Sequence, residues 1–233
     1  MLRLSISAAV LTTCLVAAVS CASPVVAIEY RAGHDWSRSE RAAIQGVADR
    51  AARDVRPLLP GLPTNLRITV QAGDRVIPET GENGSIGLPA AVYWTVNPKR
   101  QGGVLAVVTA QLRATLFHEW YHLVREGKFS PQTLAEQAVN EGLATAFERD
   151  FGGAPTPWGA YPTEVGAWTT ELLAQGPAAS SRAWMYTHPD GRRWIGFKVG
   201  TYLADRAVRQ SGLSLAQLAG EPTERIITLA KVQ

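Results

Sequence analysis

Two histidines and a glutamate near the middle of the chain have the spacing of a metal site. The segment Leu116–His122 reads Leu-Phe-His-Glu-Trp-Tyr-His and so contains His-Glu-x-x-His. Residues four apart lie on one face of a helix, which allows His118 and His122 to direct two imidazoles at one ion. Zn²⁺ binds neutral imidazole readily and keeps one coordination position open in catalytic sites. Glu119 follows the first histidine, where its carboxylate can take a proton from a metal-activated water. The spacing therefore predicts a hydrolytic zinc site.

Glu141 is the predicted third ligand. It follows His122 by nineteen residues, and the turn-forming stretch from Gly127 to Pro131 separates the two helical patterns. In a helical hairpin of this length Glu141 returns to the ion and completes a set of two histidines and one carboxylate. Gly142 beside it either lets two helix backbones approach closely or marks a simple packing contact. The alternative is that Glu141 is a solvated helix charge and the histidines are partly buried polar residues.

The order of motifs resembles a known group of enzymes. His118-Glu119-x-x-His122 followed by Glu141-Gly142-Leu143-Ala144 is similar to the gluzincin metallopeptidases. More narrowly, the chain resembles a bacterial family of predicted zinc-dependent proteases in the peptidase MA-like group. That family shares His-Glu-x-x-His, Glu-Gly-Leu-Ala, Pro-Trp and Gly-Tyr-x-x-Gly in this order. The matching positions here are Pro157-Trp158 and Gly196–Gly200, with Phe197 where the family commonly has Tyr, and the resemblance covers roughly residues 105 to 229.

The resemblance implies a zinc-dependent hydrolase with Zn²⁺ as its cofactor and a peptide or protein as its substrate. It also implies that His118, His122 and Glu141 hold the metal and that Glu119 is the general base. Two alternatives stay open: a zinc hydrolase of non-protein amides, and a secreted zinc-binding or inhibitor-like module without turnover. Glu119 argues against the second alternative, because a structural zinc site needs no base and usually has four Cys or His ligands.

Two parts of the predicted site have no assigned residue. Many gluzincins carry a carboxylate four residues after the ligand glutamate, where it orients a zinc histidine, whereas this chain has Thr145. Either another group such as Glu148 or a backbone carbonyl takes this role, or the metal binds more weakly than usual. The second missing part is a donor to the oxyanion that forms when water attacks a carbonyl. The candidates are Tyr202 and His188, followed by Tyr161 and Tyr186.

The elements that must position these residues are one small sheet and several helices. Apolar residues recur at helical spacing from Ser37 to Leu59, and Ser37 with Glu40 forms a capping box. Strands are predicted at Leu66–Val70 and Ala90–Val96, with a loop at Thr80–Gly87 between them. Helices are expected near 108–126, 131–150, 163–175, 191–211 and 222–230.

This order of elements predicts an α+β fold in which a small sheet-containing N-terminal half precedes a helical half. The resemblance adds that the fold is zincin-like, with the active-site helix at the cleft between the halves. Strand 90–96 is the predicted edge for an extended peptide that binds by strand addition.

Residues 1–27 have the pattern of a signal peptide. A positive start with Arg3 is followed by an apolar run, and small residues suit cleavage after Ala22 or after Ala27. A second interpretation is lipidation at Cys21, because residues 18–21 resemble a lipobox. The apolar run is shorter than the roughly 20 residues that cross a bilayer, so no transmembrane helix is expected in the mature chain. The leader predicts a secreted or cell-envelope location.

Composition supports one catalytic domain over residues 28–233. The chain has 233 residues, of which 46% are hydrophobic, enough for one substantial core. Its formal net charge is only +3 and its basic residues are scattered, which argues against nucleic acid as a partner. Both cysteines, Cys14 and Cys21, lie in the leader, so the mature domain is expected to be stable without a disulfide.

Overall fold

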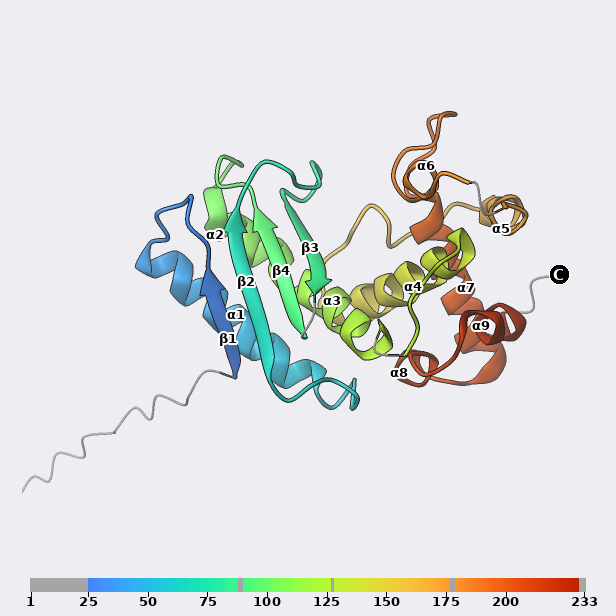
Figure 1. Cartoon of the computed structure of the whole chain (residues 1–233), viewed down its shortest axis with the longest axis horizontal. Helices are drawn as coiled ribbons and strands as arrows, with labels where there is room; N and C mark the ends of the chain where they lie inside the picture. The colour runs from blue at the N-terminus through green and yellow to red at the C-terminus, as the bar shows by residue number, and fades with distance from the viewer. Residues whose placement is uncertain (1–24, 88–89, 127, 177–178, 231–233) are drawn as a thin grey trace, which may run out of the picture.

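A sheet and a group of helices lie side by side in the computed structural model of the chain (Figure 1). The structure describes residues 25–230 apart from 88–89, 127 and 177–178. Cleavage after Ala22 and lipidation at Cys21 are predictions that fall outside these residues. The α+β prediction is confirmed by the arrangement of the described elements. Among the described helices, none combines the length and the apolar character that crossing a membrane requires.

The sheet has the strand order β1-β2-β4-β3 in the described part of the chain. Its strands are β1 (Val26–Tyr30), β2 (Leu66–Ala72), β3 (Glu82–Gly87) and β4 (Ala91–Val96). The first, second and fourth strands are parallel, whereas β3 runs antiparallel to β4 at one edge. In this register Ile68 lies opposite Val92, and Gly84 lies opposite Trp94. The side chains of Ile68, Val92 and Trp94 are buried, so they contribute to the core.

Helix α1 (Arg38–Val55) connects β1 to β2 and begins at the predicted capping box of Ser37 and Glu40. Its buried residues are Ile44, Ala48, Ala51, Ala52 and Val55, which form one apolar stripe. Asp49 on this helix accepts hydrogen bonds from the backbone N–H groups of Val25 and Val26 at 2.9 and 3.0 Å. The helix therefore fixes the start of β1 as well as covering the core.

Two sequence predictions about the sheet are wrong. The segment predicted as a loop, Thr80–Gly87, contains β3, and Ala90–Val96 is not an edge, because β4 lies between β2 and β3. The cause of the first error is local composition: the Gly, Asn and Ser residues of β3 have low β-propensity, and its ladder with β4 stabilises it instead. Strand β1 was not predicted, and Ala27 at the second candidate cleavage position lies within it.

The helical half follows β4. Its elements are α2 (Gly103–Val107), the π-helical turn η1 (Val108–Leu112), α3 (Arg113–Glu126), α4 (Leu134–Phe147), the π-helical turn η2 (Glu148–Gly152), α5 (Val165–Leu173), α6 (Ser181–Met185), α7 (Ile195–Ser211), α8 (Leu215–Leu218) and α9 (Thr223–Leu229). The short helices α6 and α8 were not predicted, since four or five residues are too few for a periodic pattern.

Helix α3 lies at the boundary between the two halves (Figure 1). It contacts β3 on one side and α4 on the other. The side chains of Phe117, Trp120 and Tyr121 are fully buried, so α3 is a central core helix. Helix α4 begins at a capping box formed by Thr133 and Glu136. The two helices thus form the hairpin that the spacing of the candidate ligands requires.

Helix α4 crosses α7 at two glycines. A Cβ atom on Gly142 would lie 1.9 Å from the carbonyl carbon of Gly200, and a Cβ atom on Gly200 would lie 1.8 Å from the oxygen of Ala138. The close approach suggested for Gly142 therefore exists, and its partner is α7. Because Glu141 is the next residue along α4, the crossing also sets the position of that carboxylate.

We expect Gly142→Ala and Gly200→Ala to lower the free energy of unfolding by more than the about 1 to 3 kcal/mol typical of overpacking, because the clash is with backbone atoms. Gly166→Ala in α5 is the matched control: its added Cβ meets nothing within 4 Å and should stabilise the helix by up to about 1 kcal/mol. Chemical denaturation measures all three. A Gly142→Ala protein as stable as the wild type would contradict the crossing.

Candidate metal centre

Three side chains from two helices meet in the cavity between the halves. His118 and His122 come from α3, and Glu141 comes from α4. The Nε2 atom of His118 lies 3.1 Å from Nε2 of His122 and 3.2 Å from Oε2 of Glu141. Nε2 of His122 lies 3.4 Å from the same carboxylate oxygen. The structure therefore brings the predicted ligand atoms to one point.

These separations fit a tetrahedral zinc ion. Ligand atoms about 2.05 Å from Zn²⁺ at tetrahedral angles are about 3.3 Å apart, close to the three observed distances. Two imidazole nitrogens and a carboxylate oxygen all direct electron pairs toward this point, and no single proton can satisfy all of them. A small cation can, so the residues present fit the metal implied by the motif.

Glu148 holds His118 from the side opposite the ligand nitrogen. Oε2 of Glu148 lies 3.0 Å from Nδ1 of His118, and the indole N–H of Trp158 donates to the same oxygen at 3.3 Å. Glu148 is the first residue of η2 and follows Glu141 by seven residues, about two helical turns, so both carboxylates lie toward α3. A hydrogen bond from Nδ1 to this carboxylate leaves Nε2 free to bind a metal. Of the partners that the sequence allowed for His118, the structure therefore shows the Glu148 carboxylate at Nδ1.

Thr145 occupies the position where many gluzincins have a carboxylate. It is fully buried, and its Oγ1 atom has no hydrogen-bond partner among the described residues. The hydroxyl therefore does not take over the orienting role, which lies one turn further along the chain at Glu148.

Asn140 holds His122 in a comparable way. Its Nδ2 atom lies 3.1 Å from Nδ1 of His122, while its buried Oδ1 atom has no partner within the described part of the chain. Metal binding through Nε2 of His122 requires a proton on Nδ1, which in turn requires an acceptor. Rotation of the carboxamide by 180° presents Oδ1 to Nδ1, and we expect this orientation in the zinc-bound protein.

The local electrostatics favour positive charge at the ligand point. Burial opposes the charge on His118, but hydrogen bonds to Glu141 and Glu148 raise the pKa of this histidine well above its ordinary value. Burial also opposes the charge on Glu141, but the attraction of His122 and the bonds to both histidines lower the pKa of that carboxyl. The carboxylates thus stabilise a cation between them.

Glu119 lies in the same cavity, beneath β3. Burial raises its pKa to about 7, although the charges of His118 and His122 act in the opposite direction. A Cβ atom on Gly84 would lie 2.5 Å from Oε1 of Glu119 and 2.6 Å from Cγ2 of Thr115. Glycine at this position of the edge strand therefore leaves room for the carboxylate. An isolated glycine in a strand often marks such a close approach, but the segment was predicted as a loop.

Glu82 is a second buried carboxyl that the sequence analysis missed. One of its oxygens accepts hydrogen bonds from the indole N–H of Trp94 at 2.8 Å and from the hydroxyl of Thr115 at 3.0 Å. Burial raises the pKa of Glu82, and the two hydrogen bonds oppose that shift. The residue lines the cavity and ties β3, β4 and α3 together next to Glu119.

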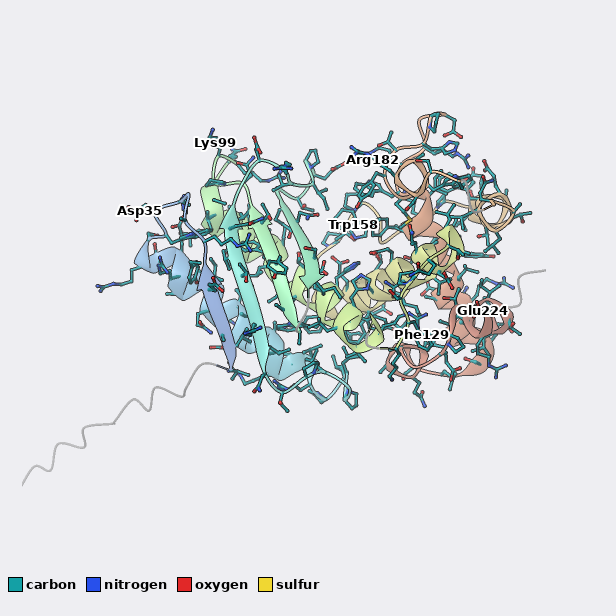
Figure 2. The ribbon with its side chains drawn as sticks, in the orientation of Figure 1. Asp35, Lys99, Phe129, Trp158, Arg182 and Glu224 are labelled. Atoms are coloured by element: carbon teal, nitrogen blue, oxygen red, sulfur yellow. The ribbon has the colours of Figure 1, made fainter. Side chains whose placement is uncertain are left out.

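The cavity has a volume of about 300 Å³ and is lined by both halves of the molecule. Residues 82–86 of β3 form one side, and the candidate ligands lie on α3 and α4. Four aromatic residues also line it: Trp158, Tyr186, Trp194 and Phe197. Figure 2 shows Trp158 on the side of the helical half that faces the sheet. The site therefore combines a polar centre with an aromatic wall.

Trp194 anchors the aromatic wall through an unusual backbone conformation. Its φ of 60° lies in the left-handed region that non-glycine residues rarely adopt, at a cost of about 1 to 2 kcal/mol. Its N–H donates to the carbonyl of Tyr186 at 3.0 Å, and the two ring centroids are 5.7 Å apart. Its ring also contacts Trp158 at 5.2 Å. The turn thus presents Tyr186 and Trp194 side by side.

Tyr186 is the only one of the four candidate oxyanion donors that lines the cavity formed by the described residues. The hydroxyl of Tyr202 accepts from Arg206 at 3.3 Å. The hydroxyl of Tyr161 donates to Asp205 at 2.9 Å. His188 lies with Nδ1 2.8 Å from Asp190. The two candidates ranked first on sequence are therefore placed outside the cavity.

An α+β fold with two histidines, a glutamate and a neighbouring carboxylate in one cavity has the features of a zinc-dependent hydrolase. Comparison with protein families agrees. Residues 44–228, well over half of the chain, match the family described as Predicted Zn-dependent protease (DUF2268), and the chain belongs to this family. A search of curated proteins returned no match, and a search of solved structures returned none.

Loss of the carboxylate behind His118 should weaken zinc binding. We expect Glu148→Ala to lower the affinity for Zn²⁺ by about 10- to 100-fold, because Nδ1 loses its acceptor, and Glu148→Gln to lower it less. Glu224→Ala on the exposed surface of α9 is the control. Competition with a chromophoric chelator measures the dissociation constants, and circular dichroism checks folding. Equal affinities for folded Glu148→Ala and wild-type protein would exclude this role.

Proposed function

We propose that the protein is a zinc-dependent peptidase in which His118, His122 and Glu141 hold the metal and Glu119 is the general base. The observation that carries the proposal is the set of ligand distances of 3.1, 3.2 and 3.4 Å in a cavity that Glu119 also lines. The family description supports a protease in general. Zn²⁺, when bound, acts as a Lewis acid that polarises a carbonyl and makes water acidic enough to lose a proton near neutral pH.

The residues of the chain supply the remaining parts of the reaction. An oxygen of the Glu119 carboxylate accepts the proton of the attacking water and then passes it to the nitrogen of the leaving amine. Glu148 and Asn140 hold the two imidazoles in place from behind. The narrow space under Gly84 keeps the Glu119 carboxylate against the reacting groups.

The edge strand β3 supports a peptide as the substrate. Apart from a bridge between Ile77 and Glu82 at its first residue, β3 pairs only with β4 in the described part of the chain, and residues 83–86 line the cavity. An extended peptide can add to such an edge through main-chain hydrogen bonds. This assigns to β3 the role that the sequence analysis gave to the strand at 90–96.

Tyr186 is our proposed donor to the oxyanion. It lines the same cavity as Glu119 and Glu141. Burial raises the pKa of its hydroxyl, and the negative charges of Glu141 and Glu119 act in the same direction. Phe197, at the position where the resembling family commonly has Tyr, cannot donate a hydrogen bond. The rings of Tyr186 and Phe197 have centroids 6.4 Å apart, so both face the same part of the site.

Zinc content and peptide cleavage test the proposed function together. We expect one zinc per chain in wild-type and Glu119→Gln proteins, and a large loss of zinc in Glu141→Ala. Glu119→Gln should lower kcat by at least about 100-fold, which is typical of removing a general base. A quenched-fluorescent peptide library measures cleavage, with Glu224→Gln and chelator-treated protein as controls. Undiminished zinc in Glu141→Ala would overturn the ligand set, and cleavage by Glu119→Gln at the wild-type rate would overturn the base.

Removal of the Tyr186 hydroxyl tests the oxyanion assignment. We expect Tyr186→Phe to lower kcat by about 100-fold with little change in KM, because the hydrogen bond strengthens only as the oxyanion forms. Adding Phe197→Tyr to this variant should restore part of the rate. Tyr202→Phe, outside the cavity, is the matched control. If Tyr186→Phe retains the wild-type kcat, another group donates.

A further inference from the structure

An open groove of about 870 Å³ adjoins the cavity that holds the candidate metal site. The two share Ile77, Asn83, Tyr186 and Trp194 in their linings, so they form one continuous depression. The rest of the groove comes from the loop after β2, from the start of α6 and from the segment before α7. None of these segments contributes a candidate zinc ligand. The groove therefore extends the site beyond the reacting centre.

The charged lining of this groove is entirely basic within the described residues. It consists of Arg75, Arg182 and Arg193. Arg193 forms an ion pair with Glu79, whereas Arg75 and Arg182 are both exposed and form no ion pair in the described part of the chain. Three arginines here contrast with a net charge of only +3 for the whole protein. The groove thus concentrates positive charge beside a cavity that is itself rich in carboxylates.

Other observations place this charge close to the cavity. Arg182 lines the groove together with Tyr186 and Trp194 of the aromatic wall. Burial raises the pKa of Tyr186, and the charge of Arg182 opposes that shift. Burial lowers the pKa of Lys198 on α7, and the charge of Arg193 lowers it further. Figure 2 shows Arg182 at the top of the helical half, above Trp158 and on the side toward the sheet.

The edge strand leads from the cavity into the groove. A β-bridge between Ile77 and Glu82 ties the Arg75–Pro78 segment to the first residue of β3. This bridge occupies the outer edge of β3 at Glu82, so a peptide paired with the rest of that edge would leave it near Asn83 and enter the groove that Arg75 and Arg182 line. An extended chain covers about 3.3 Å per residue, so the substrate residues that reach the groove lie a few positions from the scissile bond.

We propose that this groove binds carboxylate side chains of the substrate, so that the enzyme prefers peptides with Asp or Glu on one side of the scissile bond. The inference rests on the proposed peptidase function and adds the substrate class. Arginine suits this task because its guanidinium stays charged and matches a carboxylate with two parallel donors. The carboxyl group is the acidic group of an ordinary peptide at neutral pH, and the exposed guanidinium groups of Arg75 and Arg182 are available to it.

Matched peptides test the preference. Each pair places Asp and Glu, or their isosteres Asn and Gln, on the N-terminal or the C-terminal side of the same scissile bond, with both peptide ends blocked. For zinc-loaded wild-type protein we expect kcat/KM to be higher for the acidic member on one side only. Arg75→Gln and Arg182→Gln should each reduce this advantage by about 2- to 5-fold, the range of an exposed ion pair, and the effect should weaken as salt is added.

Arg225→Gln, an exposed arginine on α9, is the control and should leave the advantage unchanged. Peptides with a free C-terminus distinguish side-chain carboxylates from a terminal carboxylate: a preference seen only with the free end would overturn the proposal. Equal kcat/KM for acidic and amide peptides, or the same preference on both sides of the bond, would also overturn it. The proposal would also be overturned if the arginine variants changed kcat/KM equally for the acidic and the amide member of a pair.

Binding separates this inference from the proposed function. Fluorescence anisotropy with the Glu119→Gln protein measures affinity for the labelled acidic and amide peptides without turnover. Acid-selective binding that is lost in the Arg75→Gln/Arg182→Gln double variant supports the groove even if no peptide is cleaved. Cleavage without acid selectivity leaves the peptidase function standing and removes the groove from it.

Discussion

The contact between α3 and α4 is the constraint on which the rest of the site depends. It brings two imidazole nitrogens and a carboxylate oxygen within 3.4 Å of one another in a largely buried place, where uncompensated polar groups are costly. The arrangement is satisfied by a small cation among these three atoms, provided that the other polar atoms of the same side chains are hydrogen-bonded. Glu148 and Asn140 meet this condition, and the Gly142–Gly200 crossing holds α4 at the required position.

The sheet-containing half contributes one side of the cavity that holds the candidate metal site. Strand β3 lies at the edge of the sheet, and its Gly84 faces Glu119. Beyond the bridge of Ile77 to Glu82, its outer edge has no strand partner among the described residues. Glu82 fastens the same strand to α3 through Thr115. The two halves are thus joined at the residues that define the cavity, and a movement of β3 would alter both the space around Glu119 and the binding edge. The stability of the fold and the shape of the candidate site therefore depend on the same contacts.

Local patterns account for what the sequence could predict. The spacing of His118 and His122 is set within one helical turn, and the capping box of α1 within four residues, so both can be recognised without a fold. The spacing of Glu141 after His122 predicted a third ligand but left a solvated helix charge as the alternative, because its position depends on how α4 packs on α3. Glu82 and Gly84 were missed, because their roles come from strand pairing. Tyr186 was one of four candidate donors, and only the turn at Trp194 places it in the cavity. The predicted loop at 80–87 failed for the same reason, since its strand exists through pairing with β4.

Strand β1 has a consequence for the maturation of the protein. Its first residue, Val26, is fully buried, pairs with Leu66 and bonds to Asp49 through its backbone. A signal peptidase that cut after Ala27 would release a chain that begins at Ile28, without the first two rungs of this ladder and without both hydrogen bonds to Asp49. A cut after Ala22 leaves all of them in place. If residues 1–27 hold the predicted leader, the buried start of β1 therefore favours a cut that precedes the strand.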